Sequence, residues 1–497
     1  MSTAGPSDHM TAPVPEPGNR ASRRSGLSRR VVLGAAVAGG AGMAAIRLLG
    51  LDRALAGQGS IASRSDWNSP LGGEAARVAH LLRRTGFGAS PDELETATAA
   101  GFNRTIDRLL ESKPTPPPEL PAAAIQRGYG LNVPELQLWW LQHILTTPTP
   151  FAERMTLFMH GHFTSDYRKV GTQTPYMHWQ NLTWRQMAMT DLRSMLLQVT
   201  SDPAMLRYLD LGQSTGKSPN ENYSRELMEL FTMGAGNFTE DDVRAGAKAL
   251  AGWVEPKPTS TVTVTVDAKN NVTRQYPVWD RPLTGMVDPK RSYPGPVAFL
   301  GRSGVSDTSA VIDSILARPA TATYFTSRVM QSFAMAQPPS EFVKRVSDKF
   351  RASKYDMKTL MAEIFRSPEF VAAPSYRGLV KSPTEFMVHT LKALKAPQLA
   401  RQAVTSGPGM GQQLFDPPDV GGWPNNDSWI SSNDVMARVN YVSGVLAAMK
   451  TLPPAADVHR QQLDNVLSPQ TATLMSQATD DHTRWFLALA SPEFQLK

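Results

Sequence analysis

The sequence contains no cysteine among its 497 residues. This absence excludes disulfide bonds, zinc–thiolate sites, iron–sulfur clusters, blue-copper centres and a cysteine nucleophile. The chain also lacks a run of about 18 uninterrupted apolar residues, so we expect no membrane-spanning helix. Its 39 prolines argue against a long coiled coil. Hydrophobic residues make up 41% of the chain, which is enough for a large folded protein that is stabilised mainly by packing.

The positive charge is concentrated near the start of the chain. The formal net charge is +7, of which residues 1–56 carry +4 and the remaining 441 residues carry +3. That remainder contains no basic run interleaved with aromatic residues, which is the usual pattern of a nucleic-acid interface. We therefore expect no nucleic-acid partner.

Residues 1–56 have the pattern of an export signal. Arg29 and Arg30 precede a weakly apolar segment of small residues, 34–46, and small residues suited to a signal peptidase end at Ala56. This arrangement is similar to the twin-arginine signal, which is recognised by the twin-arginine translocase and carries folded proteins. We predict cleavage after Ala56 and a mature protein that is secreted or extracytoplasmic, with no stable membrane span after cleavage.

Residues 57–497 are predicted to form one large, mainly α-helical domain. A Ser-Pro-x-Glu pattern recurs from Ser90, Ser218 and Ser382. In this pattern the serine caps a helix, proline takes its first position and glutamate completes a capping box. Apolar positions then repeat at helical spacing. The predicted helices are 74–84, 91–100, 102–112, 134–146, 150–160, 177–200, 219–233, 240–252, 308–317, 320–335, 339–353, 356–367, 383–395, 434–449 and 480–490.

One segment has the pattern of a β-hairpin instead. Threonine and valine alternate over 261–266, Asn270 and Asn271 follow, and 272–279 can form the returning strand. This hairpin belongs to a proline-rich, irregular insertion, 254–297, within the helical domain. The expected fold class is therefore mainly α with a small β-hairpin insertion.

The helix predicted after Ser218 carries two candidate metal ligands. Asn222, Glu226 and Glu229 share one stripe of that helix. Two carboxylates three residues apart repel each other unless a cation, a proton or an arginine such as Arg225 lies between them. A divalent metal ion would remove that repulsion. The alternative is a solvated polar face.

Two further candidate ligands are His160 and His162. Gly161 between them indicates that the preceding helix ends here, and residues i and i+2 of an extended segment share a face and can bind one metal ion. On a helix the two side chains would point about 200° apart. The alternative is one core histidine that binds a backbone carbonyl and one exposed histidine.

A third candidate element is the segment 415–424, which contains paired prolines and paired glycines. Such a segment is not regular secondary structure. It can present Asp416 and Asp419 to a pocket, as general bases or as partners of metal ligands. The alternative is a structural loop whose aspartates cap neighbouring elements.

Five segments occur in the order found in one large bacterial family. They are His80–Gly88, His160–Thr164, Tyr208–Asp210, Pro219–Phe231 and the 415–424 segment. On these segments the chain resembles the domain-of-unknown-function 1800 family over roughly residues 75–450. The resemblance implies a secreted, mainly helical protein, often with a twin-arginine signal and often encoded beside a second uncharacterised exported protein. It implies no established activity.

The chain departs from the family pattern at Ser292 and Tyr293. The family usually has a His-Asp pair there, ahead of the Phe-Leu-Gly that begins at Phe299 in this chain. If that histidine is a ligand in the family, this chain lacks it or supplies it from elsewhere in 254–297.

These observations support two main hypotheses. The first is a metal-dependent extracytoplasmic enzyme, a hydrolase or an oxidase acting at the cell envelope, with a divalent metal ion on His160, His162, Glu226 and Glu229 and with Asp416 or Asp419 as general base. The alternative is a non-catalytic protein that binds an envelope polymer or assists assembly, with aromatic residues stacking on sugars: Trp139, Trp140, Trp179, Trp184, Trp253 and Trp279. A metal-free enzyme that uses the carboxylates as acid and base is a third interpretation. The substrate and the metal identity stay open.

Overall fold

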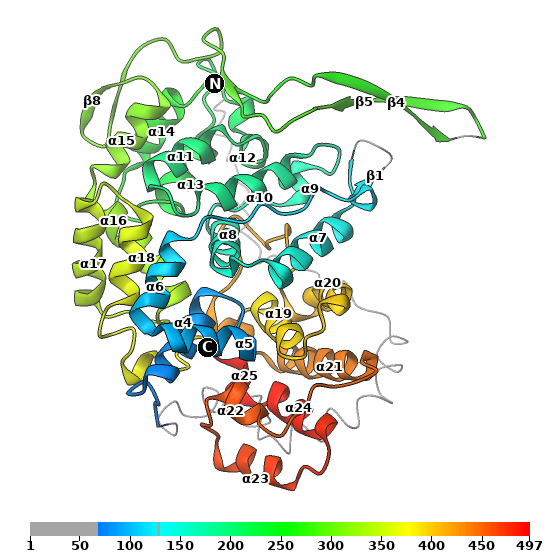
Figure 1. Ribbon diagram of the computed structural model, residues 1–497. Helices are drawn as coiled ribbons and strands as arrows, with labels where there is room; N and C mark the ends of the chain where they lie inside the picture. The colour runs from blue at the N-terminus through cyan, green and yellow to red at the C-terminus, as the bar shows by residue number, and fades with distance from the viewer. Residues whose placement is uncertain (1–67, 127–129, 268) are drawn as a thin grey trace, which may run out of the picture. The chain divides into compact units, whose positions relative to one another are not determined.

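Helices dominate the part of the chain described by the computed structural model, residues 68–126, 130–267 and 269–497 (Figure 1). The first eleven α-helices are α4 (Glu74–Thr85), α5 (Pro91–Ala100), α6 (Phe102–Glu111), α7 (Val133–Thr146), α8 (Pro150–His162), α9 (Tyr167–Val170), α10 (Tyr176–Met187), α11 (Leu192–Ser201), α12 (Pro203–Tyr208), α13 (Glu221–Glu229) and α14 (Glu240–Ala249). The prediction of a mainly α fold is confirmed.

The remaining helices follow a stretch of short strands. They are α15 (Thr308–Leu316), α16 (Pro319–Phe333), α17 (Ser340–Ala352), α18 (Met357–Phe365), α19 (Pro383–Ala393), α20 (Ala400–Ser406), α21 (Ser432–Ala448), α22 (Val458–Leu463), α23 (Pro469–Gln477), α24 (Asp481–Ala490) and α25 (Pro492–Gln495). Short 3₁₀ helices lie at Ala122–Ala124, Leu211–Gln213, Ala373–Ser375, Pro397–Leu399, Gly407–Met410 and Asn426–Trp429.

Local capping decides where several helices begin. The capping boxes at Ser90 and Ser382 are present as predicted. Ser218 does not form the predicted capping box with Glu221, because the N–H that would donate to the Glu221 carboxylate donates to the carbonyl of Thr215 (3.0 Å) in a separate turn. Asn220 caps that helix instead.

The predicted helix over 177–200 is two helices, α10 and α11. The hydroxyl and the N–H of Thr190 both donate to the carbonyl of Met187 (2.7 and 2.9 Å). A side chain that donates to a backbone carbonyl in this way competes with the backbone hydrogen bonds that would continue the helix. Asp191 then caps α11 by accepting from the N–H of Ser194 (2.9 Å).

The β structure consists of four two-stranded antiparallel sheets in the described residues. The strands are β1 (Ile125–Gln126), β2 (Gly130–Leu131), β3 (Trp253–Val254), β4 (Ser260–Asp267), β5 (Val272–Val278), β6 (Met286–Val287), β7 (Val297–Phe299) and β8 (Arg302–Val305). β4 and β5 form the predicted hairpin, with Thr263 opposite Gln275. Figure 1 shows this hairpin extending away from the helices.

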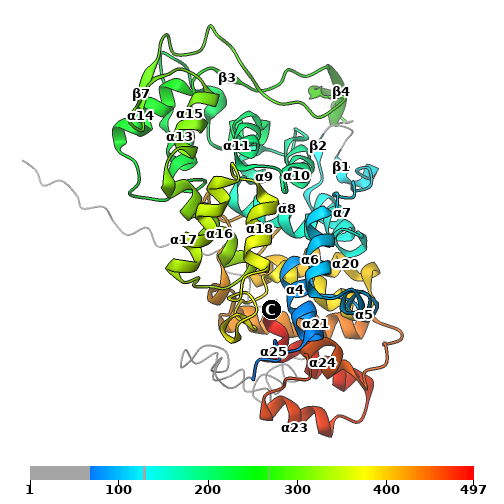
Figure 2. The ribbon, with the colours of Figure 1, turned by 60° about the vertical axis from the view of Figure 1, so that its left-hand side comes forward.

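Helix α8 forms the centre of the core. It packs against α10 and α4, and both views show it among the other helices (Figure 1 and Figure 2). Ten of its 13 residues are buried, including Glu153 and Arg154. A helix buried on nearly all sides must satisfy its polar side chains inside the protein.

Glu153 on α8 is held in a buried polar network. It accepts hydrogen bonds from Trp140 Nε1 (2.7 Å) and Arg185 Nη2 (2.9 Å), forms a second bond with Arg185 Nε, and lies 3.3 Å from His143 Nε2. Burial raises the pKa of Glu153, but His143 and Arg185 outweigh burial and lower it to about 2. The carboxylate therefore stays ionised inside the core.

The described residues group into one unit by their contacts. None of the helices in the described ranges combines the length and the hydropathy needed to cross a membrane. The predicted export signal, 1–56, lies outside the described residues.

Candidate functional site

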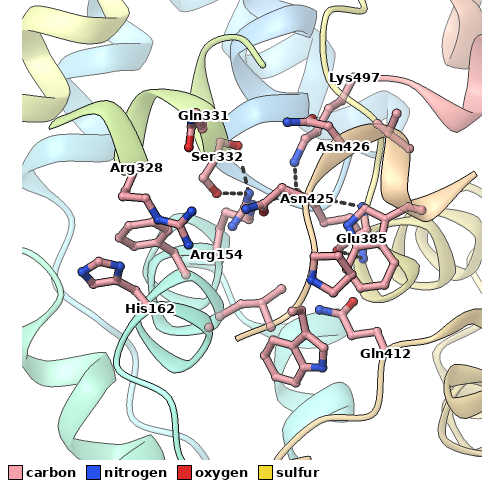
Figure 3. Close-up of a pocket in the computed structure, with 18 residues that line it drawn as sticks. Arg154, His162, Arg328, Gln331, Ser332, Glu385, Gln412, Asn425, Asn426 and Lys497 are labelled. Atoms are coloured by element: carbon pink, nitrogen blue, oxygen red, sulfur yellow. Dashed lines mark hydrogen bonds and ion pairs between the residues drawn. The ribbon is translucent and has the colours of Figure 1, made fainter. Parts of the chain in front are cut away.

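A polar pocket lies at the C-terminal end of α8 (Figure 3). Side chains from α8, α16 and α19, from the segment 412–429 and from Lys497 line a space of about 640 Å³, part of which is open to solvent. The lining is rich in polar groups, including Gln331, Gln412, Asn425 and Asn426. Several elements far apart in the sequence therefore contribute to one cavity.

Two glycines allow the segment 415–424 to cross the end of α8. Gly422 has a positive φ of 86°, and a Cβ atom there would lie 2.1 Å from the carbonyl oxygen of Gly161. A Cβ on Gly161 would in turn lie 3.4 Å from the indole of Trp423. This close approach places Trp423 in the pocket wall.

A buried ion cluster closes one side of the pocket. Glu385 forms an ion pair with Arg154 (Nε–Oε1, 2.7 Å) and another with Lys497, and it accepts from the N–H of Ser382 (2.8 Å). Burial raises the pKa of Glu385, but Arg154 and Lys497 outweigh it and lower that pKa to about 2. Burial lowers the pKa of Lys497 to about 7. Glu385 thus pairs with two cationic side chains of the pocket.

Arg328 on α16 is a third cation of the pocket. It is partly buried, and its guanidinium forms no hydrogen bond or ion pair with any residue in the described part of the chain. Figure 3 shows it beside His162, and its positive charge contributes to lowering the pKa of that histidine.

His162 keeps one ring nitrogen without a partner. Its Nε2 lies 3.0 Å from the carbonyl oxygen of Phe231, which can only accept, so Nε2 carries the proton. Nδ1 is then an acceptor, and it is buried with no hydrogen-bond partner among the described residues. Burial and Arg328 lower the pKa of His162 to about 3, so the ring is neutral at physiological pH.

The expectation of an extended segment at His160 and His162 is wrong. Helix α8 continues to His162, because Gly161 serves close packing and does not end the helix. The two rings therefore diverge. His160 lies among Trp140, Phe415 and Trp423, its Nε2 accepts from the N–H of Phe415 (3.1 Å), and burial lowers its pKa to about 3.

Glu226 and Glu229 lie near each other on α13, as their spacing predicts. Both are partly buried, and neither side-chain carboxylate forms a hydrogen bond or an ion pair within the described ranges. Arg225 does not neutralise them, because it pairs with Glu240 through two bonds of 2.7 Å. Burial and the charge of Glu229 raise the pKa of Glu226.

The two aspartates of the 415–424 segment have structural partners. Asp416 forms an ion pair with Arg168 (2.7 Å), and Asp419 accepts from the N–H of Gly421 (2.8 Å) on the surface. Burial raises the pKa of Asp416, Arg168 lowers it and Asp166 raises it further. Neither aspartate lines the polar pocket.

The predicted ligands do not gather around one point. Residues 68–126, 130–267 and 269–497 contain no group of three or more His, Asp or Glu side chains that could hold a metal ion. Ser292, at the departure from the family pattern, packs against Gly216 and Gly252, where a Cβ atom would lie 2.3 and 2.5 Å from Ser292 atoms. The prediction of a metal centre therefore gains no support from this arrangement.

The family model described as protein of unknown function (DUF1800) matches residues 80–496. The chain belongs to the DUF1800 family. No curated protein and no solved structure matches it.

In this DUF1800 protein the pocket contains residues that the sequence did not single out. Glu385 was notable only as the last residue of a capping box, and Arg154 only as a charge within an apolar helix. Arg328 and Lys497 carry no local signal. Only the fold brings these four side chains to one cavity.

The tryptophans proposed to stack on sugars are mostly core residues of this DUF1800 protein. Trp139, Trp140, Trp179 and Trp184 are buried. The tryptophans that line the pocket are Trp423 and Trp429. The indole N–H of Trp423 is buried and has no acceptor among the described residues.

Proposed function

We propose that this DUF1800 protein is a non-catalytic binding protein and that the polar pocket at the end of α8 holds its ligand, a unit of a cell-envelope polymer. The observation that carries the proposal is the set of buried groups that face no protein partner there. His162 Nδ1 and Trp423 Nε1 are both buried without a hydrogen bond to a described residue. Buried polar groups normally have a hydrogen-bond partner. A ligand that forms hydrogen bonds with these two groups would therefore bind more tightly.

The composition of the pocket supports a saccharide-like ligand. Amide side chains at Gln331, Asn425 and Asn426 face the cavity next to the indoles of Trp423 and Trp429. Amides bind hydroxyl groups as both donors and acceptors, and indole faces pack on apolar ring faces. A hydroxylated ring therefore matches this lining.

The metal-dependent enzyme hypothesis is less well supported by the geometry. His160 uses its acceptor nitrogen on the N–H of Phe415, and the unpaired Nδ1 of His162, a residue that lines the pocket, is buried. Glu226 and Glu229 do not line that pocket. One ion on all four side chains would require α8 and α13 to rearrange.

The proposed place of action is outside the cytoplasm. This part of the proposal depends on Arg29 and Arg30 ahead of the weakly apolar segment 34–46. It makes the twin-arginine translocase a partner during export. A co-encoded exported protein, which the family resemblance implies, is the partner we propose afterwards.

Cosedimentation with insoluble bacterial cell-wall polysaccharide tests the binding function. Wild-type protein should sediment with the polymer. Gln331→Trp should abolish this, because its indole would fill the cavity from a partly buried position that has no described partner. Gln142→Trp is the matched control, since Gln142 is exposed and outside the pocket. Wild-type protein that stays in the supernatant with every polymer would refute the proposal.

A further inference from the structure

The electrostatics of the pocket specify its ligand more closely. Arg154 and Lys497 share Glu385, so each of these two cations has an ionic partner within the protein. Arg328 is different, because its guanidinium lines the cavity and has no ionic partner in the described residues. A partly buried cation without a counter-ion is stabilised by an anion that enters the pocket.

The geometry of a guanidinium favours one kind of anion. Its planar fork of N–H donors matches the two oxygens of a carboxylate and forms two parallel, charge-assisted hydrogen bonds. Figure 3 shows the Arg328 side chain directed toward the cavity. A carboxylate is therefore a suitable partner at this side of the pocket.

His162 adds a second requirement. Because its Nε2 proton is held by the carbonyl of Phe231, Nδ1 presents only a lone pair. A carboxylate has no proton to donate to it at neutral pH. The ligand must therefore also carry a hydroxyl or an amide N–H close to its carboxylate.

Trp423 adds a third requirement. Its indole Nε1 is a donor only, so it needs an acceptor such as a ring or hydroxyl oxygen. Carboxylate, hydroxyl donor and oxygen acceptor occur together on the ring of a sugar acid.

We infer that the pocket recognises a sugar acid, with its carboxylate on Arg328, a hydroxyl or amide N–H on His162 Nδ1 and a ring or hydroxyl oxygen on Trp423 Nε1. This inference depends on the proposed binding function and identifies the class of polymer, an acidic one. Neutral polysaccharides lack the group that Arg328 needs.

Titration calorimetry with matched pairs of sugars tests the inference. The acidic members are D-glucuronate, D-galacturonate and N-acetylmuramate, and the neutral members are glucose, galactose and N-acetylglucosamine. At least one acidic sugar should bind wild-type protein more tightly than its neutral counterpart. Inorganic phosphate, tested in parallel, should bind more weakly than that sugar acid.

Two variants locate the interaction. Arg328→Gln should weaken binding of the sugar acid roughly 10- to 100-fold, the usual effect of losing charge-assisted hydrogen bonds. Trp423→Phe removes the N–H and keeps the aromatic body, so it should weaken binding roughly 2- to 10-fold. Arg302→Gln is the charge-matched control, because Arg302 is exposed on β8 and outside the pocket.

The outcomes separate this inference from the proposed function. Equal binding of neutral and acidic sugars, with no effect of Arg328→Gln, would overturn the sugar-acid assignment and leave the binding function standing. Phosphate binding as tightly as the sugar acids would overturn it too, since the pocket would then be a general anion site. If no sugar binds, the inference is wrong, and cosedimentation decides separately whether the protein binds a polymer.

Discussion

Gly422 lies against Gly161 so closely that a side chain at position 422 has no room without displacement. A Cβ on Gly422 would approach the Gly161 carbonyl oxygen to 2.1 Å, and the residue also has a φ of 86°. This contact joins the His-Gly-His end of α8 to the segment that carries Trp423. The pocket exists because these two stretches meet here.

Gly422→Ala should therefore destabilise the protein strongly. The positive φ alone costs a non-glycine residue about 1–3 kcal/mol, and the backbone contact adds to this. Gly236→Ala is the control, because Gly236 has a φ of 81° but a Cβ atom there would have no other atom within 4 Å. Urea unfolding should give a larger loss of stability for Gly422→Ala. Equal losses would contradict the close approach.

The free energy of unfolding should decrease over two overlapping pH ranges as the pH is lowered. The pKa of buried His160 and His162 is lowered from 6.5 to about 3, so their neutral forms stabilise the fold above pH 6.5 and this contribution is lost as the pH falls toward 3. The pKa of Glu153 is lowered from 4.5 to about 2, so its contribution is lost between those values. Thermal melts from pH 7 to pH 3 should show a steady decrease. A melting temperature that is constant between pH 6.5 and pH 4 would contradict the burial of the histidines.

Glu153→Gln tests the buried network directly. The substitution leaves Arg185, which is 2% exposed, without its counter-ion. Loss of one partner of a buried ion pair typically costs about 3–5 kcal/mol. Glu135→Gln breaks an exposed pair with Arg401 and should cost about 1 kcal/mol or less. Chemical denaturation of the two variants measures the difference.

The β4–β5 hairpin should be dispensable for folding, provided that Trp279 is kept. The N–H of Thr259 donates to the carbonyl of Val278 (2.9 Å), so a short Gly/Ser linker can replace residues 260–277. Trp279 packs on Tyr176 and Trp179. We expect the linker variant to unfold cooperatively near the wild-type midpoint and Trp279→Ala to lose about 1–3 kcal/mol. A larger loss of stability in the linker variant than in Trp279→Ala would show that the hairpin belongs to the core.

Export should depend on one arginine pair. Replacing Arg29 and Arg30 by lysine should leave the protein folded, uncleaved and in the cytoplasm, because the pathway recognises the pair ahead of the apolar segment. Arg23 and Arg24 provide a matched control, since they form a second pair farther from that segment. Cell fractionation and mass measurement of the N-terminus give the result. Normal secretion of the Arg29→Lys, Arg30→Lys variant would remove the twin-arginine assignment.

Chelation tests the metal hypothesis against the binding proposal. Without a structural ion, a chelator should leave the melting temperature of wild-type protein unchanged. Glu229→Gln should then be neutral or slightly stabilising, because it relieves repulsion with Glu226. Elemental analysis that finds a stoichiometric metal, lost in Glu229→Gln and removed by chelator with a lower melting temperature, would restore the metal-enzyme hypothesis.

Helix and hairpin positions were predictable because their signals are local. Ser90 and Glu93 close a capping box within one helical turn, and threonine and valine alternate along β4 with the period of a strand. The prediction was wrong at Ser218 and across Thr190, where a nearby backbone group competed for the same hydrogen bonds. Such competition depends on the turn that forms, which spacing alone does not reveal.

The sequence by itself determined the mainly α fold, the starts of most helices, the hairpin and the family, because each depends on residue patterns within short segments. Only the tertiary structure decided what the residues in those patterns contact. Gly161 has the pattern of a helix end and instead admits Gly422, and Glu385 has the pattern of a cap and also holds Arg154 and Lys497. Burial and charge pairing arise from contacts between distant segments, so the pocket and its unpartnered Arg328 became visible only when the chain had folded.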